Sequence, residues 1–377
     1  MSGRALAGGC AVGFAAGWNI ADTGAVAEEL ATAYDSSLAV IGLFTAALFL
    51  VHLVMQLPAG RLSDRFGPAR VCAVGLAVML ACNLLAAGAP EPWLALVARA
   101  AMGVGTALGF IGGSDLVRAS GGSPFAQGLY GGLATGGGGV ALAVVPALEP
   151  ALDWRAPYLS AVGVALVGGA LLAIAPRPSH VARGTERVAL RVLAADVRLL
   201  RLAAVFAASF GLSVVIANWV VTLLEERTSL SDEAAGAVGA STLVLGIVSR
   251  PLGGALLARR PERVRGAIVI ACLVGAGGTL ALAADSTWLA VCGAVAVGLA
   301  AGISFAPAFG GAAALHPGAP ATAVGLVNGA GALTILAGTA LVGAAFSAGV
   351  GVWAFVALAA LWAASALVSE APRSRSA

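Results

Sequence analysis

The chain has 377 residues, of which 60% are hydrophobic and only 10% are charged, and its formal net charge is +3. Soluble domains carry about 25% charged and about 45–50% apolar residues, so this composition excludes most soluble enzymes, DNA-binding modules and disordered proteins. All 21 basic residues are arginine, and a chain without lysine has neither a P-loop nucleotide site nor Schiff-base chemistry.

Apolar runs separated by short polar breaks predict twelve membrane-spanning helices, because a helix needs about 20 apolar residues to cross a bilayer. In chain order the runs cover residues 5–33, 37–57, 70–89, 92–117, 123–148, 155–175, 202–224, 232–257, 266–284, 287–313, 320–347 and 350–369. The longest polar stretch, 177–201, predicts a cytoplasmic linker between an N-terminal half at 1–176 and a C-terminal half at 202–377. The predicted fold class is an all-α integral membrane protein of two six-helix bundles.

The arginines predict how these helices are oriented. With the N-terminus placed inside, 17 of the 21 arginines fall in inside loops or termini. Arg155 and Arg227 fall outside, and Arg99 and Arg250 lie within helices. An excess of arginine in the inside loops is the positive-inside pattern. It predicts a multi-pass protein of the plasma (inner) membrane with both termini in the cytoplasm.

The two halves read as copies of one another. Glycine and phenylalanine residues recur at nearly constant offsets of 194 to 197 positions. The recurring pairs are Gly60 and Gly254, Gly103 and Gly298, Phe110 and Phe305, and Gly128 and Gly325. A parallel repeat of six and six helices is the architecture of one large class of secondary transporters.

A sequence motif follows the second apolar run. Residues 60–70 read GRLSDRFGPAR, which resembles the G-x-L-x-D-R-x-G-x-x-R signature of the major facilitator superfamily, in the loop where that family carries it. Residues 99–105 read RAAMGVG and are similar to the family's R-x-x-x-G-x-G motif in the fourth helix. Asp115 and the pair Trp154-Arg155 also stand at familiar family positions. By this resemblance the whole chain is identified as a member of the superfamily.

The chain departs from the family pattern at three places. Ala258 stands at the position of the second half that matches Asp64, so the second copy of the loop motif has lost its acid. Ala294 stands at the position that matches Arg99. The fifth apolar run is rich in glycine but lacks the Gly-Pro pair of the family's antiporter motif, which weakens a drug-efflux interpretation.

The loop motif predicts a conformational latch at the cytoplasmic face. Glycines at its ends allow tight backbone where two helices meet. Asp64 can accept hydrogen bonds from a neighbouring helix N-terminus or pair with an arginine. The resemblance implies that such a cluster holds the two halves together, and the alternative is that these charges only mark topology. The predicted latch residues are Gly60, Asp64, Arg65, Gly67, Arg70 and Asp115.

Polar residues inside the spans are the candidates for substrate binding and proton coupling, because a charge in a membrane is costly unless it has a partner or a cavity. Arg99 lies about two turns into the fourth helix. Its expected role is to bind substrate or to tune the pKa of an acid, and the alternative is that its side chain snorkels to the interface. Asp22, three residues after Asn19, carries a proton, forms a structural ion pair with Arg99, or does both.

Further polar groups lie in other spans. His52 and Gln56 share one face of the second helix, and the histidine is a second candidate proton site. Asn218 and Asn328 form hydrogen bonds between helices of the second half or line the cavity. Arg250 is expected to snorkel or to join a latch in the second half. No side chains have the spacing of a metal site, and no cofactor is expected.

The leading hypothesis is a secondary active transporter that moves a small solute by alternating access, as a proton symporter. The alternatives are a facilitative uniporter, a drug or metabolite exporter of the same fold, and an integral-membrane transferase, for which the chain lacks a catalytic cluster. We therefore expect no enzyme activity. The expected partners are a small-molecule substrate, protons and the lipid bilayer, with no nucleic acid, and we expect a monomer.

Overall fold

The computed structural model describes residues 1–178 and 189–369, and these residues form helices without any strand. Ten segments of the described chain are long and apolar enough to cross a membrane, and one of them, Pro124–Ala173, holds two helices. Together with the first helix this makes twelve, so the predicted all-α membrane fold is confirmed. Four arginines used in the orientation argument lie outside the described residues: Arg183, Arg187, Arg373 and Arg375.

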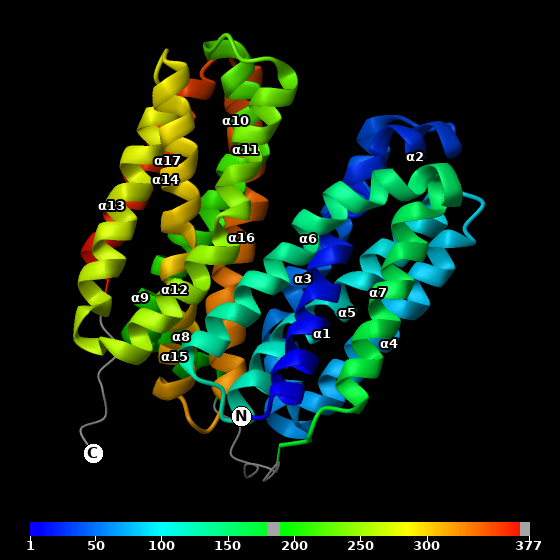
Figure 1. Cartoon of the computed structure of the whole chain (residues 1–377), viewed down its shortest axis with the longest axis vertical. Helices are drawn as coiled ribbons and strands as arrows, with labels where there is room; N and C mark the ends of the chain where they lie inside the picture. Colours follow the sequence, from blue (N-terminus) through cyan, green and yellow to red (C-terminus); the bar gives the residue numbers. More distant parts are fainter. Residues whose placement is uncertain (179–188, 370–377) are drawn as a thin grey trace. The chain divides into compact units, whose positions relative to one another are not determined.

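The described chain divides into two compact units, of which unit 1 contains residues 1–122, the described part of 133–187, and 318–325. Its long helices are α1 (Gly3–Ala21), α3 (Leu38–Phe66), α4 (Pro68–Ala87), α5 (Pro92–Ala119), α7 (Ala156–Ala173) and the later part of α6 (Pro124–Leu152). The short helix α2 (Ala27–Ala33) follows α1. Helix α1 packs against α5 and α7, and α4 packs against both of these (Figure 1).

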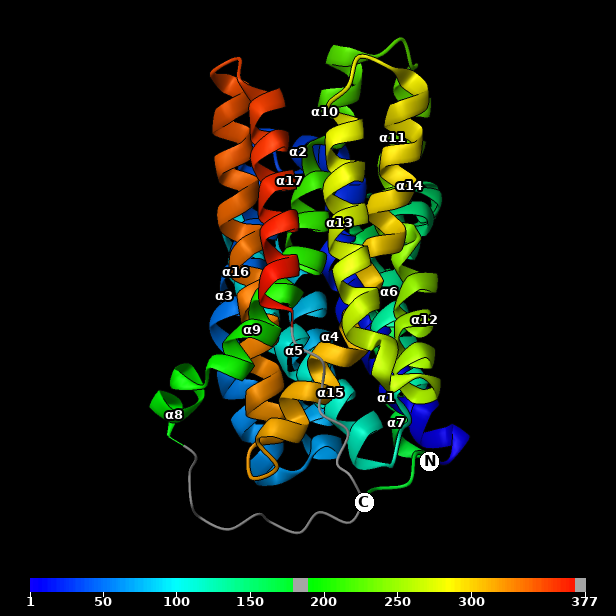
Figure 2. The same ribbon diagram turned by 90° about the vertical axis from the view of Figure 1, so that its left-hand side faces the viewer.

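Unit 2 contains residues 123–132, the described part of 188–317, and the described chain from 326 onward. Its helices are α8 (Leu190–Ala195), α9 (Val197–Phe206), α10 (Ser213–Arg227), α11 (Asp232–Val244), α12 (Gly246–Arg259), α13 (Val264–Leu282), α14 (Thr287–Ile303), α15 (Phe305–Leu315), α17 (Gly351–Val368) and most of α16 (Pro320–Ser347). Figure 2 shows α13 running beside α14 and α17, and these are closely packed pairs.

Two helices contribute to both units. The start of α6, within Ser123–Gly132, belongs to unit 2, and the rest of α6 belongs to unit 1. The start of α16, within Gly318–Gly325, belongs to unit 1, and the rest of α16 belongs to unit 2. The two segments are counterparts in the repeat, because Gly128 and Gly325 are 197 positions apart. Each unit therefore includes the first turns of one helix from the other half of the sequence.

Several predicted spans are interrupted helices. The first run was expected to continue to residue 33, but α1 ends at Ala21, because the Asp22 side chain accepts the N–H of Thr23 and a 3-10 turn follows. In unit 2, a π-helical turn at Ala207–Leu212 separates α9 from α10, and short breaks separate α11 from α12 and α14 from α15. The matching helices α3 and α5 of unit 1 are continuous. π-Helical turns are frequent at functional sites.

Apolar side chains fill the interior of each unit and also cover its outer faces. Phe44 and Tyr158 lie in the core of unit 1, and Trp362 lies in the core of unit 2, all fully buried. In contrast, Trp288 and Leu367 are exposed by 79% and 88%. Such exposure would be a liability in water, whereas a bilayer accepts apolar side chains at no cost.

Candidate functional site

A buried ion pair joins α1 to α5. Arg99 Nη1 lies 3.0 Å from Asp22 Oδ1, and both side chains are 0% exposed. The backbone N–H of Thr23 donates to the same carboxylate oxygen over 2.7 Å. Asp22 Oδ2 has no hydrogen-bond partner within the described part of the chain. One oxygen of Asp22 therefore takes both the ion pair and the backbone bond, and the other oxygen takes neither.

Arg99 also caps the C-terminal end of α1. Its Nη2 donates to the backbone oxygen of Asn19 over 2.8 Å, and its Nη1 lies 3.3 Å from Met102 Sδ. The last carbonyls of a helix have no partner within that helix, and a cation is favourable beside them. Arg99 thus binds the end of α1 and the charge of Asp22 together. It does not snorkel to the interface, because its side chain is fully buried.

Asn83 of α4 completes this cluster and is not among the predicted site residues. Its Nδ2 donates to Asn19 Oδ1 over 2.7 Å and to the backbone oxygen of Met79 over 2.9 Å. Asn19 in turn donates to the backbone oxygen of Ala15. The available signal was an asparagine inside an apolar run, which is the same signal that singled out Asn19.

A second polar contact lies between α3 and α5. His52 Nδ1 and Thr106 Oγ1 are 3.0 Å apart. The Thr106 hydroxyl also lies 3.2 Å from the backbone oxygen of Gly103, and its one proton can go to that oxygen or to His52, so both tautomers of the ring fit this contact. Gln56 donates to the backbone oxygen of His52 over 3.1 Å. Both His52 and Gln56 are buried.

The remaining polar candidates belong to unit 2. Asn218 of α10 is exposed, and its Nδ2 donates to Thr339 Oγ1 of α16 over 3.0 Å. The neighbouring Trp219 donates to the backbone oxygen of Thr339. Asn328 of α16 is buried. The structure therefore brings Asp22, Asn19 and Arg99 together, pairs His52 with Gln56 nearby on α3, and places the two asparagines in the other unit.

Asp64 of α3 caps the N-terminus of α16. Its Oδ1 accepts the N–H of Ala321 over 3.0 Å, and its Oδ2 accepts the N–H and the hydroxyl of Thr322 over 2.9 and 2.6 Å. The first N–H groups of a helix lack partners within the helix, and a carboxylate there is favourable. All of these residues belong to unit 1. Of the two geometries expected for Asp64, the structure has the helix N-terminus.

Asp115 forms a separate contact beside this cap. It accepts a hydrogen bond from Ser63 Oγ over 2.7 Å and forms an ion pair with Arg118 one turn later on α5. Gly67 connects α3 to α4 with a φ of 87°, a conformation that favours glycine. The Arg65 guanidinium lies over the Phe66 ring. Arg70 is exposed.

Two helix crossings share one backbone geometry. In unit 1, a Cβ added to Gly60 would lie 2.5 Å from the oxygen of Ala321 and 2.6 Å from Thr322 Cα. In unit 2, a Cβ added to Gly254 would meet the oxygen of Pro124 and lie 2.9 Å from Phe125 Cα. The α3/α16 crossing and the α12/α6 crossing are therefore related by offsets of 194 and 197 positions, as the sequence repeat is.

The α12/α6 crossing contains Arg250. Its side chain is 3% exposed, and its Nη1 donates to the backbone oxygen of Gly131 over 2.5 Å. Its guanidinium lies 5.0 Å from the Phe210 ring centre and 4.9 Å from that of Phe305. Arginine over aromatic faces is an attractive arrangement, stronger when water is excluded. Arg250 therefore does not snorkel, and it ties α12 to the start of α6.

Comparisons with known proteins agree on the fold. A variant of the E. coli fucose:proton symporter FucP matches with a TM-score of 0.73, and a structure described as the Major Facilitator Superfamily transporter FucP in the outward conformation matches with a TM-score of 0.75. Each is 15% identical and covers 96% of this chain and 97% of its own. The human organic anion transporter MFSD10 matches with a TM-score of 0.72 at 16% identity, covering 98% of this chain and 100% of its own.

A comparison with curated proteins finds no match. The model of the Major Facilitator Superfamily matches residues 8–339, which is most of the chain and includes every candidate site residue. The motifs at residues 60–70 and 99–105 lie within this match. The chain belongs to the Major Facilitator Superfamily, a family of membrane transporters and not of enzymes.

Proposed function

We propose that this protein is a secondary active transporter that moves a small solute by alternating access and couples its movement to protons through Asp22 and Arg99. The observation that carries the proposal is the fully buried ion pair between α1 and α5. One structural neighbour is described as a proton symporter and another as an organic anion transporter. The family supports transport in general, and the residues of this chain support the coupling.

Protonation of Asp22 would change the forces within this pair. Removing one charge of a buried pair leaves the other uncompensated, at a cost of about 3–5 kcal/mol. A proton on Asp22 has the same electrostatic effect as removing its charge. Oδ2, which has no partner among the described residues, can accept a proton while Oδ1 keeps its bond to Thr23. The protonation state then biases the protein between two conformations.

We assign the solute contacts to five polar residues. They are His52, Gln56, Asn218 and Asn328, with Asn19 beside the ion pair. So few polar groups suit a small organic molecule or anion better than a sugar, which needs many hydrogen bonds. His52 contacts Thr106 through Nδ1, and we assign its other ring nitrogen, Nε2, to the solute, as donor or acceptor according to the tautomer.

We also assign Asp64 the role of a latch. Its three hydrogen bonds fasten the first turn of α16, and alternating access requires that contacts of this kind form and break. We place the protein in the plasma (inner) membrane as a monomer with both termini in the cytoplasm. Arginines concentrated in the predicted inside loops support this orientation.

Uptake into proteoliposomes tests the coupling. A thermal-shift screen over small organic acids, amines and sugars first identifies the solute, since a bound ligand raises the apparent stability. Uptake is then measured with and without an imposed pH gradient, and exchange is measured with no gradient. We expect Asp22→Asn to abolish gradient-driven accumulation and to retain part of the exchange, because exchange needs no net proton movement. Arg99→Ala should impair both.

The matched control is Asp35→Asn, which changes an exposed carboxylate of the loop after α2. It should accumulate the solute as the wild type does. Accumulation by Asp22→Asn in response to the gradient would contradict the assignment and make His52 the next candidate. A wild type that ignores the gradient would identify the chain as a facilitative uniporter or as coupled to another ion.

A further inference from the structure

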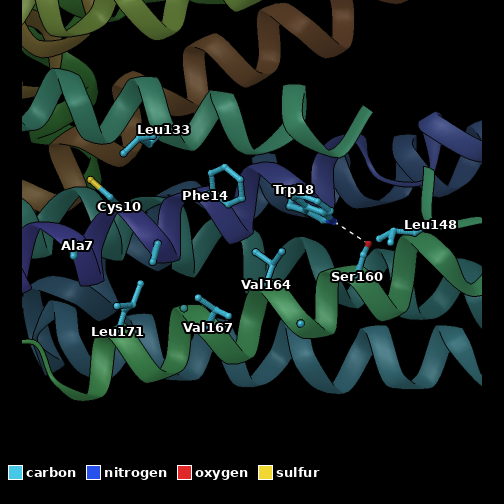
Figure 3. A pocket seen from close by; sticks show the side chains of 13 residues that line it. Ala7, Cys10, Phe14, Trp18, Leu133, Leu148, Ser160, Val164, Val167 and Leu171 are labelled. Carbon is cyan, nitrogen blue, oxygen red and sulfur yellow. Dashed lines mark hydrogen bonds between the residues drawn. The ribbon is translucent and has the colours of Figure 1, made fainter. Parts of the chain in front are cut away.

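An apolar groove lies in unit 1 between α6 and α7, with α1 as its floor. Its volume is about 610 Å³, within the range of about 300–1,000 Å³ typical of ligand sites. Figure 3 shows Leu133 of α6, Phe14 and Trp18 of α1, and Val164 and Val167 of α7 bordering the same space. None of these side chains belongs to the ion pair or to the helix crossings described above.

The groove has no polar group to offer a water-soluble ligand. The indole N–H of Trp18 donates to Ser160 Oγ over 3.2 Å, and the Ser160 hydroxyl in turn donates to the backbone oxygen of Pro157. These polar atoms therefore satisfy one another at one end of the groove (Figure 3). The rest of the lining is aliphatic, aromatic or glycine, with the thiol of Cys10. A hydrocarbon chain matches such a lining.

The dimensions fit one leaflet of a bilayer. On α1 the lining extends from Ala7 to Trp18, a rise of about 16 Å at 1.5 Å per residue. The hydrocarbon core of a bilayer is about 30 Å thick, so one leaflet contributes about 15 Å. The groove therefore has the length of a lipid chain that enters beside Ala7 and ends at the Trp18–Ser160 bond.

A basic residue stands at the open end. Arg4 is exposed and precedes Ala7 and Ala11 of the lining by three and seven positions, so it lies on the same face of α1 one turn beyond the groove. Helical side chains lean toward the N-terminus, which carries the guanidinium further toward the headgroup region. The first turn of α1 contains no acid. This charge complements a phosphate of the leaflet on that side.

The geometry points to a binding site for one anionic phospholipid, with an acyl chain in the groove between α6 and α7 and its phosphate at Arg4. The chain would contact Leu133, the residue at which α6 passes from unit 2 into unit 1. A lipid at this position would hold α6 in place. Bilayers rich in anionic lipid should therefore stabilise the protein more than neutral bilayers do.

Lipid retention measured by native mass spectrometry tests the site. The full-length protein is reconstituted in vesicles of equal parts phosphatidylglycerol and phosphatidylcholine with identical acyl chains, then extracted. We expect one retained phosphatidylglycerol, at least tenfold over phosphatidylcholine. Gly163→Leu should lower this retained fraction at least fivefold, because Gly163 lines the groove and a Cβ there meets open space. Arg4→Gln should remove the preference for phosphatidylglycerol.

The matched control is Gly277→Leu on α13, where a Cβ also meets open space but which lies outside the groove. It should retain lipid as the wild type does. If Gly163→Leu folds poorly, Val167→Phe at the exposed rim of the groove replaces it, with the same expected loss. Unchanged retention in a folded groove variant would overturn the proposal, and so would a wild type that holds both lipids equally.

Discussion

The α3/α16 crossing of unit 1 and the α12/α6 crossing of unit 2 have the same backbone geometry and different chemistry. Gly60 and Gly254 allow the same close approach in both. At the first crossing, Asp64 of α3 caps the N-terminus of α16. At the second, the position matching Asp64 is Ala258, and Arg250 of α12 binds a backbone oxygen of α6 instead. The two crossings therefore share their backbone packing but differ in the side chain that joins the two helices.

The two helix starts differ in the donors that they offer to an acid. Asp64 accepts two N–H groups and one hydroxyl, from Ala321 and Thr322. Their counterparts are Pro124, which has no N–H, and Phe125, which has no hydroxyl. An acid at position 258 would find one donor where Asp64 finds three.

The two helix starts also differ in their own caps. Ser123 precedes α6, and its Oγ accepts the N–H of Ala126 over 3.2 Å. Ala319 precedes α16 and has no side-chain acceptor. Helix α6 is therefore capped by its own chain, whereas α16 depends on a carboxylate from another helix. In this chain, the crossing that lacks the motif acid is also the one whose helix start has its own side-chain cap.

Transport should fall most when the close backbone contact of either crossing is blocked. Gly60→Ala and Gly254→Ala should each lower transport more than 100-fold, because the added Cβ meets backbone and not a flexible side chain. Uptake per folded protein in proteoliposomes measures the effect. The controls are Gly42→Ala on α3 and Gly246→Ala on α12, where a Cβ meets open space. Retained activity in either crossing variant would contradict the close packing.

Removing the cap of α16 should have the next largest effect. Asp64→Ala should slow uptake about 10- to 100-fold with little change in membrane abundance, because hydrogen bonds to a charged group are worth about 1.5–3 kcal/mol. Asp64→Asn should be nearly as harmful, since its amide NH₂ would face an N–H donor. Thr322→Val, which removes one of the three bonds, should cost about fivefold. Equal losses of abundance and activity would mean that Asp64 serves folding only.

Removing the cap of α6 should have a smaller effect. Ser123→Ala should cost about 1 kcal/mol of stability, which lowers the melting temperature by about 2 °C. Transport should change less than twofold, because Arg250 still fastens the crossing. Thermal unfolding in detergent measures the shift. A loss of transport as large as that of Asp64→Ala would show that the two crossings depend on their helix caps to the same extent, which would contradict the difference between them.

The smallest effect concerns a third helix start, that of α9. Partial burial raises the pKa of Asp196, but the N–H groups of Arg198 and Leu199 and the ring of His316 outweigh this and hold the pKa below its ordinary value of 3.8. A lowered pKa means that the contribution of Asp196 to stability is present above 3.8 and is lost as the pH falls through the folded value. The melting temperatures of the wild type and of Asp196→Asn should differ slightly at pH 7. They should become equal once the pH lies below the pKa of Asp196 in the folded protein. If the difference in melting temperature grew as the pH falls, the lowered pKa of Asp196 would be contradicted.

Much of the fold could be predicted from the sequence, because hydropathy reports directly on the bilayer. The interruptions could not, since the Asp22 side chain that ends α1 and the π-helical turn after α9 depend on tertiary contacts. The sequence placed Arg99 and Asp22 in spans and suggested their pairing. It did not show which residues Asn83 and Arg250 would contact, because Asn19 and the rings of Phe210 and Phe305 are distant from them in sequence.

A double-mutant cycle at the N-terminus of α16 tests directly whether Asp64 acts by capping that helix. Ala319→Ser gives α16 a cap of its own, at the position where Ser123 caps α6. Uptake is measured for the wild type, Asp64→Ala, Ala319→Ser and the double variant. We expect Ala319→Ser alone to change uptake less than twofold and to raise that of Asp64→Ala at least fivefold. If the serine leaves Asp64→Ala at its low rate, Asp64 does not act by capping α16, and the account of the two crossings is wrong.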